Sequence, residues 1–455
     1  MSYKNARLLV LIVFAVAFIS SCGTEPEKAL DKLDQYTTVP GSVLISPDCK
    51  KVARIVQVKG KQYVVLNGEN GKQYDSIFEG SLVFSKDGSR LAYLARQGGK
   101  WFVVADGRED KAYDGVGKGS IAFSADGKLA YSVTTGGRWM MVLDGKEQKQ
   151  YDGIASAPVF SDDGSHAAYF AQDGRFWFAV LDGKEQDGYD AITGAPVFSP
   201  DGKRLAYTVR KGDKWLVVAD SAEGRPYEGI ATAPLFNKTG RSLAYVVMDG
   251  GKQFLVVDGV EQKHYDGVGE PVFSTDGRRL AYGVQEGAKW AVVVDGKEGS
   301  PKDAVGSIIA FSPDGERVAY AAKDGGKWCV VLDGKPGKLY DGTMSSNLKF
   351  SADGKHVAYA VKDGAKWRVV EDGKEGKPYD EVASGSLVFG PGSGRLAYAA
   401  EENKTRFVVV DGSEMKRYSV IVNNFGGKIV FDSPDTIRYI ALKDTSIYMV
   451  TEKMK

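Results

Sequence analysis

The sequence predicts an all-β protein built from one repeated unit, and three observations support this. A phenylalanine that precedes a turn recurs along the 455-residue chain at spacings of 37 to 39 residues. Asp-Gly and Gly-Gly pairs, which supply the positive φ angles of two-residue hairpins, separate short apolar runs. Beyond the first 21 residues, no apolar pattern has the period of a helix. The phenylalanines are Phe84, Phe123, Phe160, Phe198, Phe236, Phe273, Phe311, Phe350 and Phe389.

Each unit contains four short strand candidates. In the unit that begins at Phe198, the first strand ends at that residue, the second is 205–207, the third is 215–218, and the fourth lies near Tyr227. Four consecutive antiparallel strands in about 40 residues are typical of one blade of a β-propeller. The sequence therefore predicts a propeller of about eleven four-stranded blades, when the degenerate copies at the two ends are included.

The repeats fill residues 36–455, with degenerate copies around Ile45 and Phe431. Eleven units exceed the usual four to eight blades, so two arrangements remain open. One is a single large ring, and the other is two tandem propellers of five and six blades, with a seam near 230–305. The segment at Tyr36 matches a fourth strand and 447–450 match a third. We therefore expect the N-terminal strand to complete the last blade and close the ring, which removes exposed strand edges.

The N-terminus has the pattern of an export signal. Lys4 and Arg7 precede an apolar run over 8–19, which would span only about 18 Å as a helix, too short for a bilayer core of about 30 Å. A basic start, a short apolar run and small residues before a cleavage point indicate a secretory signal over 1–21.

The residues around Cys22 resemble the bacterial lipobox, in which the cysteine becomes the lipidated first residue of the mature protein. Ile19-Ser20-Ser21 precede this cysteine. The polar residues 22–35 suit a short tether. Gly23 follows the cysteine at the position where an aspartate would, in some bacteria, indicate retention at the inner membrane, so the outer membrane is favoured. We expect an exported protein anchored by lipid at Cys22, facing the periplasm or the cell surface. An ordinary cleaved signal with a chance cysteine is the alternative.

The repeats resemble the TolB-type, WD40-like propeller repeat. That repeat has a Ser-Pro-Asp-Gly turn followed by an Ile/Leu-Ala-Phe/Tyr strand, as at 199–202 with 205–207 and again at 312–315. The resemblance covers residues 36–455 and implies the fold more strongly than any function. The tract from Lys-Trp to Tyr-Asp also resembles the bacterial WG repeat, which is the second choice.

The tryptophans occupy one repeat position, five residues before the aspartate of the second Asp-Gly turn. A ring of exposed aromatic side chains could bind glycan or peptide. Because binding sites usually break the symmetry of a repeat, we expect these side chains to fill equivalent gaps between blades instead, so that truncating one opens a buried cavity. They are Trp101, Trp139, Trp177, Trp215, Trp290, Trp328 and Trp367.

The sequence shows little catalytic chemistry. Lysine and arginine number 60 against 59 acidic residues, without a basic stripe, so nucleic acid is not an expected partner. His166 and His356 share one repeat position but belong to distant blades. Each Asp-Gly turn carries a single carboxylate, so no calcium or other metal site is expected. Cys49 and Cys329 lie at non-equivalent positions, which makes a disulfide improbable.

The leading hypothesis is a non-enzymatic envelope lipoprotein whose propeller is a protein–protein interaction scaffold. We predict no catalytic residues and no cofactor. The expected partners are the membrane, through the anchor, and other envelope proteins. The surface made by the loops between strands four and one and between strands two and three is the candidate contact face. The alternatives are a propeller-type lyase or hydrolase acting on envelope polysaccharide or peptide, and a purely structural component.

Overall fold

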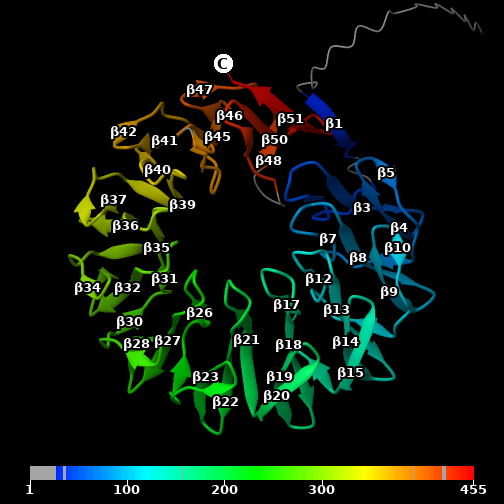
Figure 1. The fold of residues 1–455 in the computed structure, drawn as a ribbon. Coiled ribbons are helices and arrows are strands. Elements are labelled where there is room, and N and C mark those ends of the chain that lie inside the picture. The colour runs from blue at the N-terminus through cyan, green and yellow to red at the C-terminus, as the bar shows by residue number, and fades with distance from the viewer. Residues whose placement is uncertain (1–26, 34–36, 156, 393, 423–426, 455) are drawn as a thin grey trace, which may run out of the picture.

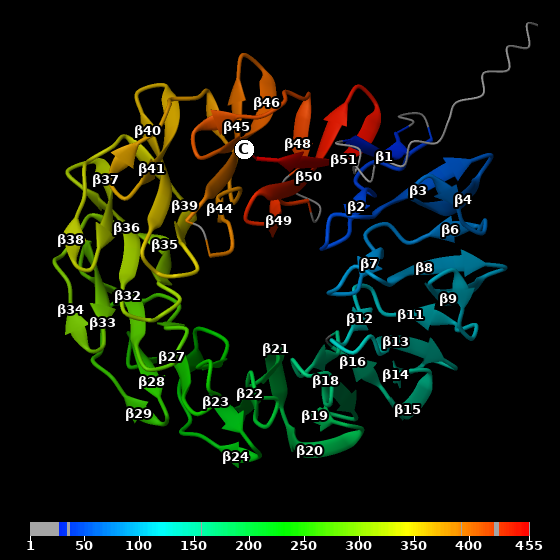
Figure 2. The same ribbon diagram turned by 45° about the horizontal axis from the view of Figure 1, so that its top comes forward.

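A computed structural model describes residues 27–33, 37–155, 157–392, 394–422 and 427–454. These residues form eleven antiparallel sheets that follow one another around one closed ring, with no helix among them (Figure 1). Both views show the same single circle of blades (Figure 2). The all-β propeller of eleven blades is confirmed. The ring is single, so the alternative of two tandem propellers is wrong.

Blade 2 shows the common plan. Its first strand is split into β6 (Ser76–Ile77) and β7 (Val83–Phe84), both paired with β8 (Leu91–Gln97). The third strand, β9 (Lys100–Ala105), follows, and the short β10 (Arg108–Glu109) ends the sheet. The first strands lie towards the centre of the ring and the fourth strands lie at its outer rim (Figure 1). We number the blades 1 to 11 in chain order.

The long second and third strands form the frame of every blade. The second strands are β3 (Val52–Val58), β8, β13 (Leu129–Thr135), β18 (Ala167–Asp173), β22 (Leu205–Lys211), β27 (Leu243–Asp249), β32 (Leu280–Glu286), β36 (Val318–Asp324), β40 (Val357–Asp363), β45 (Leu396–Glu402) and β50 (Thr436–Lys443). The third strands are β4 (Lys61–Leu66), β9, β14 (Arg138–Leu143), β19 (Phe176–Leu181), β23 (Lys214–Ala219), β28 (Lys252–Val257), β33 (Lys289–Val294), β37 (Lys327–Leu332), β41 (Lys366–Glu371), β46 (Thr405–Val410) and β51 (Ser446–Lys453).

The last blade takes its outer strand from the start of the chain. β1 (Glu27–Lys32) pairs antiparallel with β51, after β48 (Val420–Val422) and β50. Closure by the two ends of the chain is confirmed, but the strand lies nearer the N-terminus than expected. Residues 27–32, predicted as part of a tether over 22–35, are a strand, while Tyr36 lies outside the described residues.

The register explains why this segment closes the ring. Glu27 lies opposite Val450 in blade 11, as Glu261 of β29 (Val260–Glu261) lies opposite Val256 in blade 6. Leu30 is buried at the junction with blade 1, in a cluster that includes Val52. The sequence did not reveal this strand because its residues are mostly polar, as are those of the outer strands of the other blades.

Apolar clusters join each blade to the next. Between blades 6 and 7, for example, Val246 and Leu255 on one side pack with Tyr282 and Val293 on the other. Equivalent clusters cross 230–305, where a seam was considered. Burial of apolar surface between neighbouring sheets is therefore continuous through this region and holds the ring together.

Candidate interaction surface

One face of the ring carries the turns between the second and third strands, and we call it the BC face. The linkers that join one blade to the next lie on the same face. Asp114, in the linker after blade 2, accepts a hydrogen bond from the backbone N–H of Gly136 in the turn of blade 3, at 2.9 Å. It also pairs with Lys100 at 2.5 Å, and this contact lowers the pKa of the Asp114 carboxyl.

The same bond recurs around the ring. At each of these positions an acidic residue of one blade accepts from the second–third turn of the next, which fixes the turns relative to one another. The acceptors are Asp75, Asp114, Asp152, Asp190, Glu228, Asp266, Asp303, Asp341 and Asp380.

The seven tryptophans lie at the start of the third strands, beside the BC face. All seven are half-buried, and Trp101 and Trp367 pack against apolar clusters at the junctions between blades. Trp101 lies beside Tyr113 of its own blade, and the guanidinium of Arg96 is 5.8 Å from its ring centroid. Part of its ring packs on the cluster between blades 2 and 3. The indoles thus have one apolar contact surface and one surface open to solvent.

Tyrosines, which the sequence analysis passed over, fill the gaps between blades. Tyr74 of blade 1 meets Tyr93 of blade 2 edge to face, with ring centroids 6.4 Å apart. Tyr379 and Tyr398 make the equivalent pair at a distant junction, at 6.3 Å. The signal was available, since a tyrosine recurs in the second and fourth strands of most repeats. The tyrosines among the largest fully buried side chains are Tyr74, Tyr131, Tyr151, Tyr169, Tyr207, Tyr227, Tyr379 and Tyr439.

Ion pairs join the fourth strands at the outer rim. Lys263 of blade 6 lies 2.7 Å from Glu298 of blade 7, and Tyr265 donates its hydroxyl to the same carboxylate at 2.6 Å. Lys263 and Tyr265 both lower the pKa of Glu298. Equivalent pairs are Lys72–Glu109, Lys111–Glu147, Lys149–Glu185, Arg225–Glu261, Lys338–Glu375, Lys377–Glu414 and Lys416–Glu27.

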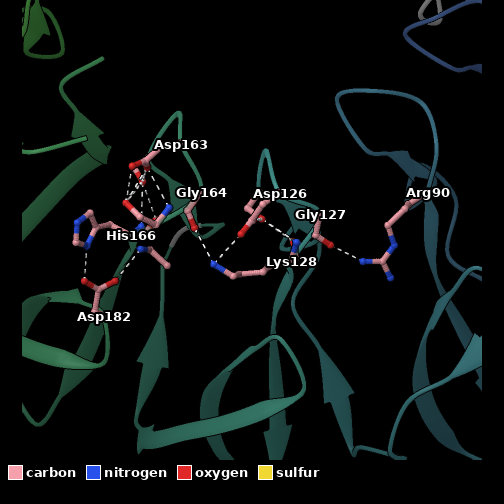
Figure 3. A network of polar contacts seen from close by, with 12 residues as sticks. Arg90, Asp126, Gly127, Lys128, Asp163, Gly164, His166 and Asp182 are labelled. Carbon is pink, nitrogen blue, oxygen red and sulfur yellow. Dashed lines mark hydrogen bonds and ion pairs between the residues drawn. The ribbon is translucent and has the colours of Figure 1, made fainter. Parts of the chain in front are cut away.

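The opposite face, which we call the AB face, holds the turns between first and second strands. There Arg90 donates to the carbonyl of Gly127 in the next blade, and Lys128 donates to the carbonyl of Gly164 at 3.1 Å (Figure 3). His166 occupies the arginine position in blade 4, and its Nδ1 lies 2.7 Å from Asp182. Arg90 and Lys128 are therefore bonded to the turns of the next blades.

The charged tips of the BC turns extend into solvent. In blade 5, Arg210, Lys211, Asp213 and Lys214 are all exposed. Arg210 also lies over Trp215, with 5.9 Å between its guanidinium carbon and the ring centroid. Exposed charges of both signs next to half-open tryptophans give this face the composition of a protein contact surface.

The two histidines that share a repeat position are not brought together. His166 belongs to blade 4 and His356 to blade 9. Each pairs with the aspartate of its own third–fourth turn, and Asp372 raises the pKa of His356. Within the described ranges, no three His, Cys, Asp or Glu side chains gather as ligands for a metal ion.

One carboxylate breaks the repeat. Glu371 ends the third strand of blade 9, where blades 1–8 and 10 carry Ala, Val or Leu and blade 11 carries Thr451. It lines a pocket between blades 9 and 10 together with His356, Asp372, Tyr398 and Asp411. Burial raises the pKa of Glu371, with a smaller contribution from Asp372. No residue of this pocket was predicted as a site.

The remaining sequence predictions concern cysteines and the membrane. Cys49 and Cys329 are both buried and unpaired with each other. Cys22 lies outside the described residues. The part of the chain that the structure covers contains no helix suited to crossing a membrane.

Comparison with known proteins gives similarity to solved structures only. No family model matches the chain, and no curated protein matches it. A eukaryotic initiation factor structure covers 77% of this chain and 91% of its own, at 15% identity and a TM-score of 0.43. The match to the Dos1 propeller covers 68% of this chain and 95% of the Dos1 chain, at 13% identity and a TM-score of 0.30. The match to TolB from Acinetobacter baumannii covers 56% of this chain and 77% of the TolB chain, at 16% identity and a TM-score of 0.26.

Proposed function

We propose that this protein is a non-enzymatic lipoprotein of the bacterial cell envelope whose propeller is a docking scaffold for other envelope proteins. The BC face is the docking surface. The TolB-type repeat signature at 199–202 and the lipobox-like residues that end at Cys22 support the placement in the envelope.

The observation that carries the proposal is the row of seven half-buried tryptophans along the BC face. Tryptophan and arginine are enriched at the energetic centres of protein interfaces, because they bury a large area on binding. Trp215 with Arg210 above it has this composition.

Rigidity of the frame supports the same proposal. Neighbouring blades are bonded at the BC face, at the AB face and at the rim, as Asp114, Arg90 and Lys263 illustrate. A preorganised surface loses less conformational entropy when a partner binds. A rigid ring that carries partly open aromatic side chains therefore suits the docking of a protein.

Site-specific photocrosslinking in intact cells tests which face binds. A photoreactive amino acid at Asp213, exposed on the BC face of blade 5, is expected to give discrete adducts with an envelope protein. The matched control is Lys203, exposed on the AB face of the same blade. Arg210→Glu is expected to abolish the adduct formed at position 213. Equal adducts from both faces, or an adduct that survives Arg210→Glu, would contradict the proposal.

An enzyme is the second candidate, and Glu371 is the observation that favours it. A carboxyl with a raised pKa next to a His–Asp pair has the composition of a general acid site for a lyase or hydrolase. If envelope polysaccharide or peptide is cleaved by the purified protein, Glu371→Gln should remove the activity. Release of new chain ends that depends on Glu371 would favour the enzyme over the scaffold.

A further inference from the structure

The junction between blades 11 and 1 differs from the other junctions in its buried contacts. At five other junctions a fourth-strand tyrosine of one blade meets a second-strand tyrosine of the next edge to face, as Tyr74 meets Tyr93. At the closing junction the register puts Asp31 of β1 opposite Ile447, where Tyr265 lies opposite Gln253 in blade 6. A pair of opposite charges thus replaces a pair of aromatic rings.

Arg54 of β3 takes the second-strand tyrosine position in blade 1. Its Nε lies 2.7 Å from Asp31 Oδ2, and its Nη2 donates to Oδ1 at 3.2 Å. The Asp31 side chain is only 3% exposed and that of Arg54 only 9%. Bidentate pairing of this kind satisfies both charges in a buried setting, and removing one partner leaves the other uncompensated.

Arg54 makes two further hydrogen bonds, one to the end of β1 and one to the segment that leads into blade 1. It donates to the carbonyl of Lys32 at 3.1 Å and to the hydroxyl of Thr38 at 3.0 Å. One guanidinium therefore joins the closing strand, the start of the first blade and β3. No equivalent arginine bridge joins successive blades at the tyrosine positions quoted above.

We propose that the Asp31–Arg54 pair is a lock that holds β1 on the edge of β51, and that breaking it opens the ring at this junction alone. The outer contacts of β1 are the same as those in other blades, because Glu27 accepts from Tyr418 at 2.7 Å and pairs with Lys416. The buried charge pair of Asp31 and Arg54 takes the place that two tyrosines hold at the junction of blades 1 and 2. When one partner is lost, the other stays buried as an uncompensated charge. This destabilises β1, which is held to blade 11 by its pairing with β51 and not by a turn that connects the two strands.

Hydrogen–deuterium exchange on the full chain tests the lock. Asp31→Asn and Arg54→Gln are each expected to speed amide exchange at least tenfold in 27–32 and 446–453, leaving 205–219 in blade 5 unchanged. The double variant should exchange no faster than either single variant, since the two groups act as one unit. Tyr265→Phe, which removes a rim hydrogen bond between blades 6 and 7, is the matched control and should leave 27–32 protected.

Three results would overturn the proposal. One is unchanged exchange in the single variants. Another is an equal increase in blade 5, which would mean general destabilisation. The third is an increase in the double variant equal to the two single effects combined, which would show that Asp31 and Arg54 act independently.

Discussion

Tyrosine and tryptophan have different roles in this repeat, although both recur at fixed positions. Tyr227 is 1% exposed, bonds Glu261 through its hydroxyl and packs edge to face on Phe254. Trp215, in the same blade, is half-buried and keeps part of its indole in solvent. The tyrosine completes the apolar junction between blades, whereas the tryptophan borders the BC face.

Replacing Tyr227 and Trp215 one at a time by alanine tests whether the tyrosine contributes more to stability than the tryptophan. Tyr227→Ala is expected to lower the free energy of unfolding by about 3–5 kcal/mol, because it leaves a cavity between blades. Trp215→Ala should cost only about 1–2 kcal/mol, since less apolar area leaves water there on folding. Denaturant titration of both variants measures the difference. A larger loss for Trp215→Ala would mean that the indole is enclosed after all.

His356 makes one contact between turns sensitive to pH. Its Nδ1 lies 2.6 Å from Asp372, and this contact raises the pKa of the imidazole above the ordinary 6.5. Stabilisation by a group with a raised folded-state pKa is complete below the unfolded pKa and is lost as pH rises through the folded value. The pair therefore contributes in mildly acidic solution and fades in alkaline solution.

Replacement by arginine, which this position carries in other blades, tests the effect. His356→Arg should match the wild-type melting temperature at pH 5.5 and exceed it at pH 8.5, because arginine stays charged. His356→Gln should show the reverse, a deficit at pH 5.5 that vanishes at pH 8.5. Melting curves across this range give the answer, and a difference independent of pH would exclude titration of His356 as the cause.

At the scale of elements, the turns on the AB face nest into one another. Gly354 has a φ of +71°, and a Cβ added there would lie 2.8 Å from a carboxylate oxygen of Asp314 in the preceding blade. Gly373, in the third–fourth turn of blade 9, has a similar φ of +79° but no atom within 4 Å of that position. The same backbone conformation thus occurs with and without a close neighbour.

Alanine at these two glycines separates backbone strain from nesting. Gly373→Ala should cost about 1–2 kcal/mol, the usual cost of a left-handed conformation for an L-residue. Gly354→Ala adds the clash with Asp314 and should lower the free energy of unfolding roughly twice as far. Denaturant midpoints measure both. Equal losses would show that the turn of blade 9 moves away from blade 8 without cost.

For the molecule as a whole, the proposed lipidation site at Cys22 lies close in sequence to the first strand of the ring. Glu27 follows Cys22 by five residues, which reach at most about 18 Å when fully extended. Lipidation at Cys22 would therefore hold the rim of blade 11 close to the bilayer surface. Residues 27–32 of the expected tether over 22–35 belong to β1 instead.

The proposed anchor at Cys22 can be tested directly by substitution. Cys22→Ala should abolish acyl labelling in cells and move the protein from the membrane fraction to the soluble fraction, because the acyl chains supply the membrane affinity. The ring itself should be unaffected, as judged by an unchanged melting temperature of the purified protein. Persistent labelling of the alanine variant would reject Cys22 as the site of lipidation.

The repeat, the four strands of each blade and the count of eleven could be predicted from the sequence, because periodic Asp-Gly turns and alternating apolar residues are local signals. Closure by both ends of the chain could also be predicted from the order of the strands. The particular closing strand could not, since Glu27–Lys32 is as polar as a tether and only its pairing with β51 distinguishes it.

The single ring, the side chains that fill the junctions and the contacts that close the ring became clear from the three-dimensional arrangement of the blades. The sequence pattern could not rank tryptophan against tyrosine, because both recur at fixed positions and their burial depends on the neighbouring blade. The pocket around Glu371 and the Asp31–Arg54 pair could not be predicted from the sequence either. Each depends on contacts between residues far apart in the chain, which composition and spacing do not encode.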